Sequence, residues 1–384
     1  GMIYREAEKE LQLLSAQFKA VAVTGPRQSG KTTLVKKVFK EKAYVNLENP
    51  DLRQFAGEDP RGFLSNYPDG AILDEVQRVP ELFSYLQQIL DEKEQNGSFI
   101  LTGSNNFLLN SNISQSLAGR VGYLFLLTLD IGEINPGANM SNQLIFKGGY
   151  PEIYQKDIDP KKYYDNYIRT YVERDVRLLK NITDLYTFER FLRLCAGRTG
   201  QLLNMSSLAT DVGMDVKTIG SWLGILEASF IAFRLYPYHE NYNKRIVKMP
   251  KLYFYDTGLA SALMGIEDVS QLTIHPLRGG LFENLVVVDF LKRLYNNGKQ
   301  NNLYFWRDNI GNEVDLLIKK GVNRYPVEIK SAQTISDEFF KGIRYWNKLT
   351  NTEGGYLVYA GDMLQKRSGE INIVPVHLLN TIEI

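Results

Sequence analysis

The sequence contains only one cysteine and three histidines in 384 residues. A single thiol, Cys195, excludes a disulfide within the chain and a cysteine-based zinc site, and it is typical of a protein in a reducing cytosol. The histidines do not have the spacing of metal ligands either; they are His239, His275 and His377. The sequence therefore excludes disulfide-stabilised and zinc-binding classes of protein.

An excess of one charge and a long apolar run are also missing. The chain has 45 Lys+Arg and 44 Asp+Glu, so no overall field favours nucleic acid or acidic membranes, and any polyanion must bind locally. Apolar runs such as Tyr123–Leu127 are far shorter than the ~20 residues of a membrane span. The first residues, Gly1–Glu6, lack the apolar core of a signal peptide. We expect a cytoplasmic protein with no membrane partner.

The length of the chain predicts two or three domains, because one hydrophobic core rarely serves 384 residues. In the first part, short apolar runs alternate with helical patterns, which predicts βα units and a parallel sheet. These runs are Ala20–Val23, Ala43–Leu47, Ala71–Leu73, Phe99–Leu101 and Tyr123–Leu127. The turn cluster Gly148–Pro151 marks the expected exit from this domain.

The middle of the chain is predicted to be helical, with a long charged helix at Tyr163–Leu179. Leu208–Gly213 followed by Asp215–Ile219 is typical of a helix-turn-helix. The second helix, Val216–Ala228, carries a single cation, Lys217, so a packing role fits it as well as DNA recognition. Nearby cations could contact phosphates or form a solvated loop; they are Lys244, Arg245, Lys248 and Lys251, close to Tyr242.

One segment fits the phosphate-binding pattern G-x-x-x-x-G-K-[ST], between a predicted strand and a predicted helix. Its main-chain N–H groups and the helix N-terminus would face the phosphates. Lys31 would hold β and γ oxygens, and Thr32 would ligate Mg²⁺. The predicted nucleotide-binding residues of this loop are Gly25, Pro26, Arg27, Gln28, Ser29, Gly30, Lys31, Thr32 and Thr33.

Two carboxylates, Asp74 and Glu75, end the buried run that begins at Gly70. Asp74 would hold Mg²⁺ through water, and Glu75 would orient and deprotonate the attacking water. An Asp-Glu pair also occurs at ordinary helix starts, but its place downstream of a phosphate loop favours hydrolysis.

Polar residues next to two further predicted strands are candidates for the same site. Ser104 or Asn105 follows the strand Phe99–Leu101, where ATPases of the AAA type place a γ-phosphate sensor; a plain turn is the alternative. Arg120 precedes the run at Val121 and could serve as an arginine finger for a neighbouring subunit. A solvated or salt-bridged arginine is the alternative.

The C-terminal part carries a second group of acidic residues. Glu283 lies on an apolar helix, Asp315 on a strand, and Glu328 and Lys330 on one face of the next strand. Carboxylates converging on an apolar site would repel one another without a hard cation, which predicts Mg²⁺ or Mn²⁺. Lys330 would then position or activate the water that attacks a phosphodiester. The alternative is a nuclease-like fold retained for structure.

Several longer segments resemble one family: bacterial and archaeal AAA-type ATPases with a winged helix and a C-terminal domain similar to PD-(D/E)xK nucleases. The matching segments are Thr24–Gln28, Gly30–Leu34, Leu73–Pro80, Leu117–Arg120, Gly148–Glu152 and Thr170–Val176. The resemblance covers nearly the whole chain. It implies an α/β fold with a P-loop ATPase domain at residues 1–145, a helical linker and winged helix at 146–258, and a nuclease-like domain at 259–384. The role of Glu173, Arg174 and Asp175 in the family is unassigned; an ion-pair network bracing two domains is the plain structural interpretation.

The leading hypothesis is a Mg²⁺-dependent ATPase, with ATP preferred over GTP because of the resemblance. Nucleotide would close the first domain against a neighbouring subunit of a homo-oligomer, and the change would pass through the helix at Tyr163–Leu179, with DNA as an expected partner. One alternative is a metal-dependent DNA nuclease with a regulatory ATPase. Another is a nucleotide-dependent switch that regulates a protein partner.

Overall fold

The computed structural model describes residues 2–179, 182, 184–240 and 246–384, so Tyr242, Lys244 and Arg245 lie outside the described residues. The chain forms two compact units: residues 1–128 with 295–299, and residues 129–294 with 300–384. No helix in the described ranges combines the length and apolarity needed to cross a membrane. The predicted boundary at residue 258 stays a prediction.

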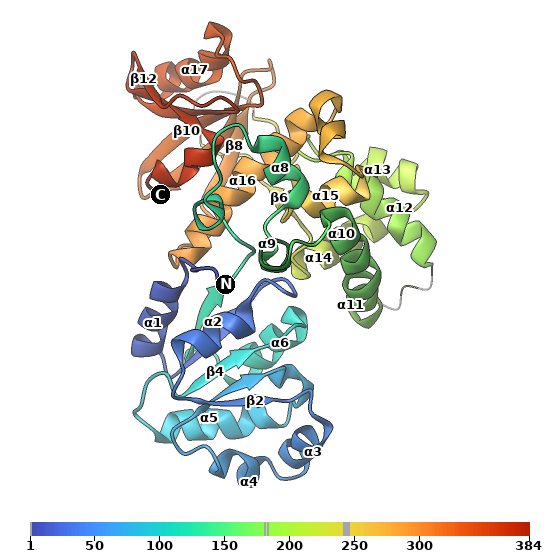
Figure 1. The fold of residues 1–384 in the computed structure, drawn as a ribbon, viewed down its shortest axis with the longest axis vertical. Coiled ribbons are helices and arrows are strands. Elements are labelled where there is room, and N and C mark those ends of the chain that lie inside the picture. The colour runs from blue at the N-terminus through green and yellow to red at the C-terminus, as the bar shows by residue number, and fades with distance from the viewer. Residues whose placement is uncertain (1, 180–181, 183, 241–245) are drawn as a thin grey trace. The chain divides into compact units, whose positions relative to one another are not determined.

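The first unit alternates strands and helices, as the apolar runs predict (Figure 1). Its elements are α1 Glu8–Gln17, β1 Ala20–Thr24, α2 Lys31–Val38, β2 Ala43–Asn46, α3 Pro50–Glu58, α4 Pro60–Ser65, β3 Ala71–Asp74, η1 Val76–Arg78, α5 Leu82–Glu92, β4 Phe99–Thr102, α6 Asn106–Ser116 and β5 Val121–Phe125.

The five strands form one parallel sheet in the order β2-β3-β4-β1-β5, which confirms the predicted sheet. Alternate strand residues enter two cores. Leu73 and Leu101 belong to the core that α3, α4, α5 and α6 cover, while Ile72 and Ile100 belong to the core that α1 and α2 cover. Burial on both faces explains why these strands are continuous apolar runs. The last strand begins at Val121, as predicted for the run that follows Arg120, and ends at Phe125.

The remainder of the chain contains helices followed by a second sheet (Figure 1). Its elements are α7 Ile131–Ile134, α8 Ser141–Lys147, α9 Pro151–Lys156, α10 Pro160–Tyr167, η2 Ile168–Val172, α11 Glu173–Leu179, α12 Leu185–Ala196, α13 Met205–Val212, α14 Val216–Ala228, β6 Ala232–Leu235, β7 Lys251–Phe254, α15 Thr257–Leu263, η3 Val269–Ile274, α16 Arg278–Asn296, β8 Leu303–Arg307, β9 Glu313–Lys320, β10 Asn323–Lys330, η4 Asp337–Phe340, α17 Lys341–Thr350, β11 Gly355–Tyr359, β12 Gln365–Arg367, β13 Ile371–Pro375 and η5 Val376–Thr381.

The second sheet is mixed, in the order β12-β13-β11-β10-β9-β8. Strands β8, β9 and β10 are antiparallel neighbours, whereas β10, β11 and β13 run parallel. The two strands predicted to carry Asp315 and Glu328 are β9 and β10. The pairing of β9 with β10 brings Asp315 and Glu328 into adjacent strands, as expected from the alternation.

The helix predicted at Tyr163–Leu179 is α10 and α11 joined by a turn of π-helix, η2. Its inner face is aromatic: Tyr163, Tyr164 and Tyr167 are buried and pack around Tyr150. The turn cluster at Gly148–Pro151, expected to leave the first domain, lies within the second unit.

Asp256 explains why this turn needs glycine. Its buried carboxylate caps α15 and accepts a hydrogen bond from the N–H of Gly149 at 2.8 Å. Gly148 has φ +66°, and a Cβ there would lie 2.1 Å from Asp256 Oδ1 and 2.2 Å from the Tyr164 hydroxyl.

Candidate functional site

The segment between β1 and α2 has the backbone that a phosphate loop requires. Gly25 has φ +152°, and a Cβ there would lie 2.0 Å from the carbonyl oxygen of Leu126, so only glycine fits. Gly30 has φ +101° and precedes the first residue of α2. The loop therefore leads from a buried strand directly to a helix N-terminus, where main-chain N–H groups can bind an anion.

Two cations hold this loop. The ammonium of Lys31 is buried and donates to the carbonyl oxygens of Gly25 at 2.6 Å and Pro26 at 3.1 Å. From the N-terminal segment, Arg5 donates to the carbonyls of Ser29 and Leu127, each at 2.7 Å. The role of Arg5 was not predicted, because nothing in the local sequence links it to a loop so far along the chain.

Asp74 lies at the carboxyl end of β3 and receives three hydroxyl donors. Thr32 donates to Oδ2 at 3.0 Å, Thr102 to Oδ1 at 2.7 Å, and Tyr44 to Oδ2 at 2.5 Å. Parallel pairing explains the last two, because Thr102 is the register partner of Asp74 on β4 and Tyr44 lies on β2. Burial, followed by the Asp74 carboxylate, raises the pKa of Tyr44. The Thr32 hydroxyl beside the Asp74 carboxylate is an oxygen donor set of the kind that Mg²⁺ prefers.

Glu75 follows in a left-handed backbone conformation, with φ +59°. Its carboxylate accepts from Ser104 twice, from the N–H to Oε1 and from the hydroxyl to Oε2, each at 2.9 Å. Gln77 donates to Oε2 at 2.7 Å. The structure therefore brings together Glu75 and the predicted sensor Ser104, and it adds Gln77, which was not predicted from the sequence.

Asn105 and Arg120, the other two residues predicted for the ATPase site, bond to residues outside that site. The side chain of Asn105 caps α6 by accepting from the N–H of Leu108 at 3.0 Å. The guanidinium of Arg120 makes a two-bond pair with Asp91, at 2.6 and 3.0 Å. Within this chain, Arg120 is thus salt-bridged, which was the alternative to an arginine finger.

The predicted C-terminal residues do converge in the second unit. The carboxylate of Glu283, whose side chain is 12% exposed, lies 3.6 Å from the buried ammonium of Lys251 and accepts from the Tyr253 hydroxyl at 3.1 Å. Asp315 Oδ2 accepts from the N–H of Ile329 at 2.9 Å. Across the same site, Lys330 Nζ lies 3.5 Å from Glu328 Oε2. We call Lys251, Glu283, Asp315, Glu328 and Lys330 the C-terminal charge cluster.

Burial dominates the electrostatics of this cluster. It raises the pKa of Glu283 to about 7, although the Lys251 ammonium acts in the opposite direction. Burial and the nearby Asp315 carboxylate raise the pKa of Glu328 well above its usual range. Glu328 Oε1 is buried and has no hydrogen-bond partner in the described part of the chain. Within those same residues, no group of three or more His, Cys, Asp or Glu has the arrangement of a metal site.

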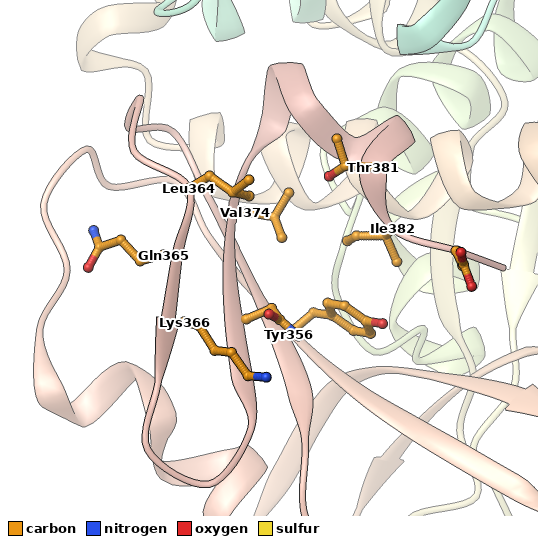
Figure 2. Close-up of a pocket in the computed structure, with 9 residues that line it drawn as sticks. Tyr356, Leu364, Gln365, Lys366, Val374, Thr381 and Ile382 are labelled. Atoms are coloured by element: carbon orange, nitrogen blue, oxygen red, sulfur yellow. The ribbon is translucent and has the colours of Figure 1, made fainter.

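A surface pocket of about 530 Å³ lies elsewhere in the second unit. Figure 2 shows Tyr356, Lys366 and Val374, from three strands of the mixed sheet, together with Thr381 and Ile382 of the C-terminal segment. None of the predicted site residues lines it.

Three family models match consecutive parts of the chain. An AAA domain matches residues 17–135. Two domains of unknown function follow, DUF8612 at residues 139–270 and DUF4143 at residues 278–379. Together with the phosphate loop on a five-stranded parallel sheet, the first match identifies an N-terminal AAA-type P-loop ATPase domain.

Two mycobacterial proteins show to which family the chain belongs. The uncharacterized proteins Rv2008c of Mycobacterium tuberculosis and Mb2031c of Mycobacterium bovis are each 32% identical to it over 337 residues, which is 86% of this chain and 75% of each relative. The chain belongs to the same family as these two proteins. Among solved structures, the Walker-type ATPase PABY2304 of Pyrococcus abyssi is similar, with 15% identity, coverage of 67% of this chain and 94% of that chain, and a TM-score of 0.45.

Proposed function

We propose that the chain binds ATP with Mg²⁺ and hydrolyses it. The observation that carries this proposal is the meeting of the phosphate loop with Asp74 and Glu75 at one edge of the parallel sheet. The Thr32 hydroxyl lies 3.0 Å from Asp74 Oδ2, and Glu75 is the next residue. Nucleotide binding requires the phosphate loop. Hydrolysis also requires a second carboxylate beside the metal ligand, which orients and deprotonates the attacking water.

Each residue of the ATPase site has a distinct role in the proposed reaction. Lys31 exchanges its bonds to the carbonyls of Gly25 and Pro26 for phosphate oxygens, which keeps its buried charge paired. Thr32 and Asp74 would hold Mg²⁺, which would supply positive charge to offset the charge of the phosphates. Glu75 orients a water and accepts its proton as the water attacks the γ-phosphorus; the bond from that phosphorus to the oxygen bridging it to the β-phosphorus breaks, and ADP leaves with the electron pair. Tyr44 and Thr102 fix the orientation of Asp74.

The nucleotide-binding step is tested by titrating the protein with ATP and MgCl₂ in a calorimeter. Lys31→Ala should lower the affinity at least tenfold, because the loop loses the cation that pairs with the phosphates. The matched control is Lys40→Ala, an exposed lysine just after the same helix, which should bind like the wild type. Equal affinity in the wild type and Lys31→Ala would remove the proposal.

The second candidate is a metal-dependent DNA nuclease at the C-terminal charge cluster, with the ATPase as its regulator. It is favoured by the convergence of Glu283, Asp315, Glu328 and Lys330, from one helix and two strands, on a site in which Asp315 and Glu328 are buried. Because no three such carboxylates of the described residues are arranged for a metal ion, Asp315 and Glu328 would have to share Mg²⁺ or Mn²⁺ with oxygens of the substrate and of water, and Lys330 would position the attacking water. The helix-turn-helix at α13 and α14 would supply contacts to DNA, although Lys217 is the only cation in the sequence of α14.

Plasmid cleavage separates this candidate from the ATPase alone. The protein is incubated with supercoiled plasmid, MgCl₂ or MnCl₂, with and without ATP. Cleavage that disappears in Lys330→Ala but persists in Lys319→Ala, on the adjacent strand β9, supports a nuclease. No cleavage in any combination, or unchanged cleavage in Lys330→Ala, would remove the nuclease candidate.

A further inference from the structure

One member of the C-terminal charge cluster, Lys251, comes from a different part of the chain. It was expected in a loop, at phosphates or in solvent, but it lies on strand β7 and its side chain is 7% exposed. Strand β7 lies in the region that DUF8612 matches, whereas Glu283, Asp315 and Glu328 lie in the region that DUF4143 matches. The ammonium also lies 5.2 Å from the centre of the buried ring of Phe305, on β8. Strand β7 therefore sends a buried positive charge to the mixed sheet.

Strand β7 provides a partner for each oxygen of the Glu283 carboxylate. Lys251 and Tyr253 are two residues apart, so their side chains lie on the same face of the strand. The Lys251 ammonium lies 3.6 Å from Glu283 Oε1, and the Tyr253 hydroxyl donates to Oε2 at 3.1 Å. Gly200 leaves room for this carboxylate, since a Cβ there would lie 2.9 Å from Oε2. Glu283 is thus engaged by a cation and a hydroxyl of one strand.

The other two carboxylates of the cluster are also engaged by the protein. Asp315 Oδ2 accepts from the Ile329 N–H at 2.9 Å, and Glu328 Oε2 lies 3.5 Å from the Lys330 ammonium. Glu328 Oε1 packs against α17, because a Cβ at Gly342 would lie 2.1 Å from it. Mg²⁺ or Mn²⁺ requires about six oxygens directed at one point. These carboxylates, within the part of the chain that the structure describes, are not arranged in that way.

We propose that the Lys251 ammonium is the built-in counter-ion of this cluster and takes the place of a divalent cation. Its charge acts on Asp315 and Glu328 as well as on Glu283. Carboxylates that would repel one another are thus offset by two ammonium groups of the chain, those of Lys251 and Lys330. The cluster joins β7 to the mixed sheet, and it binds no metal ion while Lys251 is in place. This inference goes beyond the proposed ATPase, and it sets a condition on the second candidate, since a nuclease would need Lys251 to withdraw.

Competition between the ammonium and a metal ion is tested with MnCl₂ in the absence of nucleotide. All proteins carry Asp74→Asn, so that the ATPase site does not contribute, and bound Mn²⁺ is counted by electron paramagnetic resonance. Lys251→Met keeps the length of the side chain and removes its charge. It should bind about one Mn²⁺ per chain, at least about tenfold more tightly than the protein that retains Lys251, and a further Asp315→Asn should abolish this gain. The control is Lys366→Met, which removes the exposed pair of Lys366 with Glu370 in the same unit and should leave Mn²⁺ binding unchanged.

Thermal unfolding gives a second test that needs no metal ion. Lys251→Met leaves Glu283 without its cation, so Tm should fall by at least about 5 °C. Lys251→Met combined with Glu283→Gln removes both charges and should recover at least about half of this loss. Lys366→Met should leave Tm within about 1 °C of the wild type.

Three results would overturn the proposal. One is equal Mn²⁺ affinity with and without Lys251 in folded proteins. Another is Mn²⁺ binding to the protein that retains Lys251, if Asp315→Asn abolishes that binding. The third is a double variant no more stable than Lys251→Met. None of these results bears on ATP binding, which the calorimetric titration of Lys31→Ala tests separately.

Discussion

The side chain of Asn106 satisfies both backbone polar groups of Gly25, which lies 81 residues earlier in the sequence. Its Oδ1 accepts from the Gly25 N–H at 3.1 Å, and its Nδ2 donates to the Gly25 carbonyl at 2.7 Å. Both residues are buried. This pair fixes the first residue of the phosphate loop to the start of α6, and so to the loop that carries Ser104.

Replacing Asn106 by leucine should therefore disturb nucleotide binding from outside the loop motif. The Gly25 N–H and carbonyl lose their partner in a buried place, which costs about 1–3 kcal/mol of folding free energy, and ATP affinity should fall about tenfold as the loop loosens. Urea unfolding and calorimetric titration measure the two effects. Asn49→Ala is the control, because it removes the cap of α3 in the same unit; it should lower stability by about 1 kcal/mol without changing affinity. Identical affinities in both variants would mean that Asn106 has only a structural role.

Gly148→Ala should be strongly destabilising, because the added Cβ would collide with Asp256 and Tyr164 as well as strain a φ of +66°. Gly265→Ala is the matched control, because it introduces the same backbone strain without a steric clash. Gly265 has φ +79°, and a Cβ there would meet nothing within 4 Å among the described residues. We expect the free energy of unfolding, measured with urea, to fall by about 1 kcal/mol in Gly265→Ala. It should fall by at least about 3 kcal/mol in Gly148→Ala. Equal losses would show that the contact with Asp256 does not explain the glycine.

Asp289 predicts a pH dependence of stability. It is buried beside Asp130, accepts from the N–H of Ile131 at 2.7 Å, and its Oδ2 has no hydrogen-bond partner among the described residues. Burial, followed by the charge of Asp130, raises its pKa to about 7. The folded protein thus holds a proton that the unfolded chain releases at about pH 4, so this group lowers stability as the pH rises from about 4 to 7 and adds no further change above that window.

Asp289→Asn keeps an acceptor for Ile131 and removes the titration. The free energy of unfolding of the variant should increase relative to that of the wild type as the pH rises from 4 to 8. Because one pKa unit corresponds to about 1.4 kcal/mol, the increase should reach at most about 4 kcal/mol. Thermal unfolding across that range, with Asp362→Asn as an exposed control, provides the measurement. A gain that is the same at pH 4 and pH 8 would contradict the raised pKa.

The features that could be predicted from the sequence are those formed by residues close together in the chain. The phosphate loop, its flanking strand and helix, and the five apolar runs of the parallel sheet all follow from residues close together in the chain. The partners of the predicted residues could not be found in this way. Asp91, which pairs with Arg120, and Asn106, which holds Gly25, are brought near only when the sheet assembles.

The helix at Tyr163–Leu179 shows that the burial of a side chain can also be hard to predict from the sequence. It was predicted only as a long charged helix, and the aromatic face that Tyr163, Tyr164 and Tyr167 bury against Tyr150 was not predicted. Tyrosine combines a large apolar ring with a hydroxyl, so its position in a pattern does not reveal whether the ring is buried. Gln77 was overlooked for a related reason, because a glutamine beside an acidic pair is usually exposed.

Turnover of ATP by the wild type and by Glu75→Gln tests the central claim most directly. The protein is assayed for phosphate release with saturating ATP and MgCl₂, with Glu94→Gln, an exposed glutamate of the same unit, as the matched control. The account predicts steady hydrolysis by the wild type and by the control, and at least a hundredfold lower kcat in Glu75→Gln with ATP affinity retained. Turnover in Glu75→Gln equal to that of the wild type would contradict it.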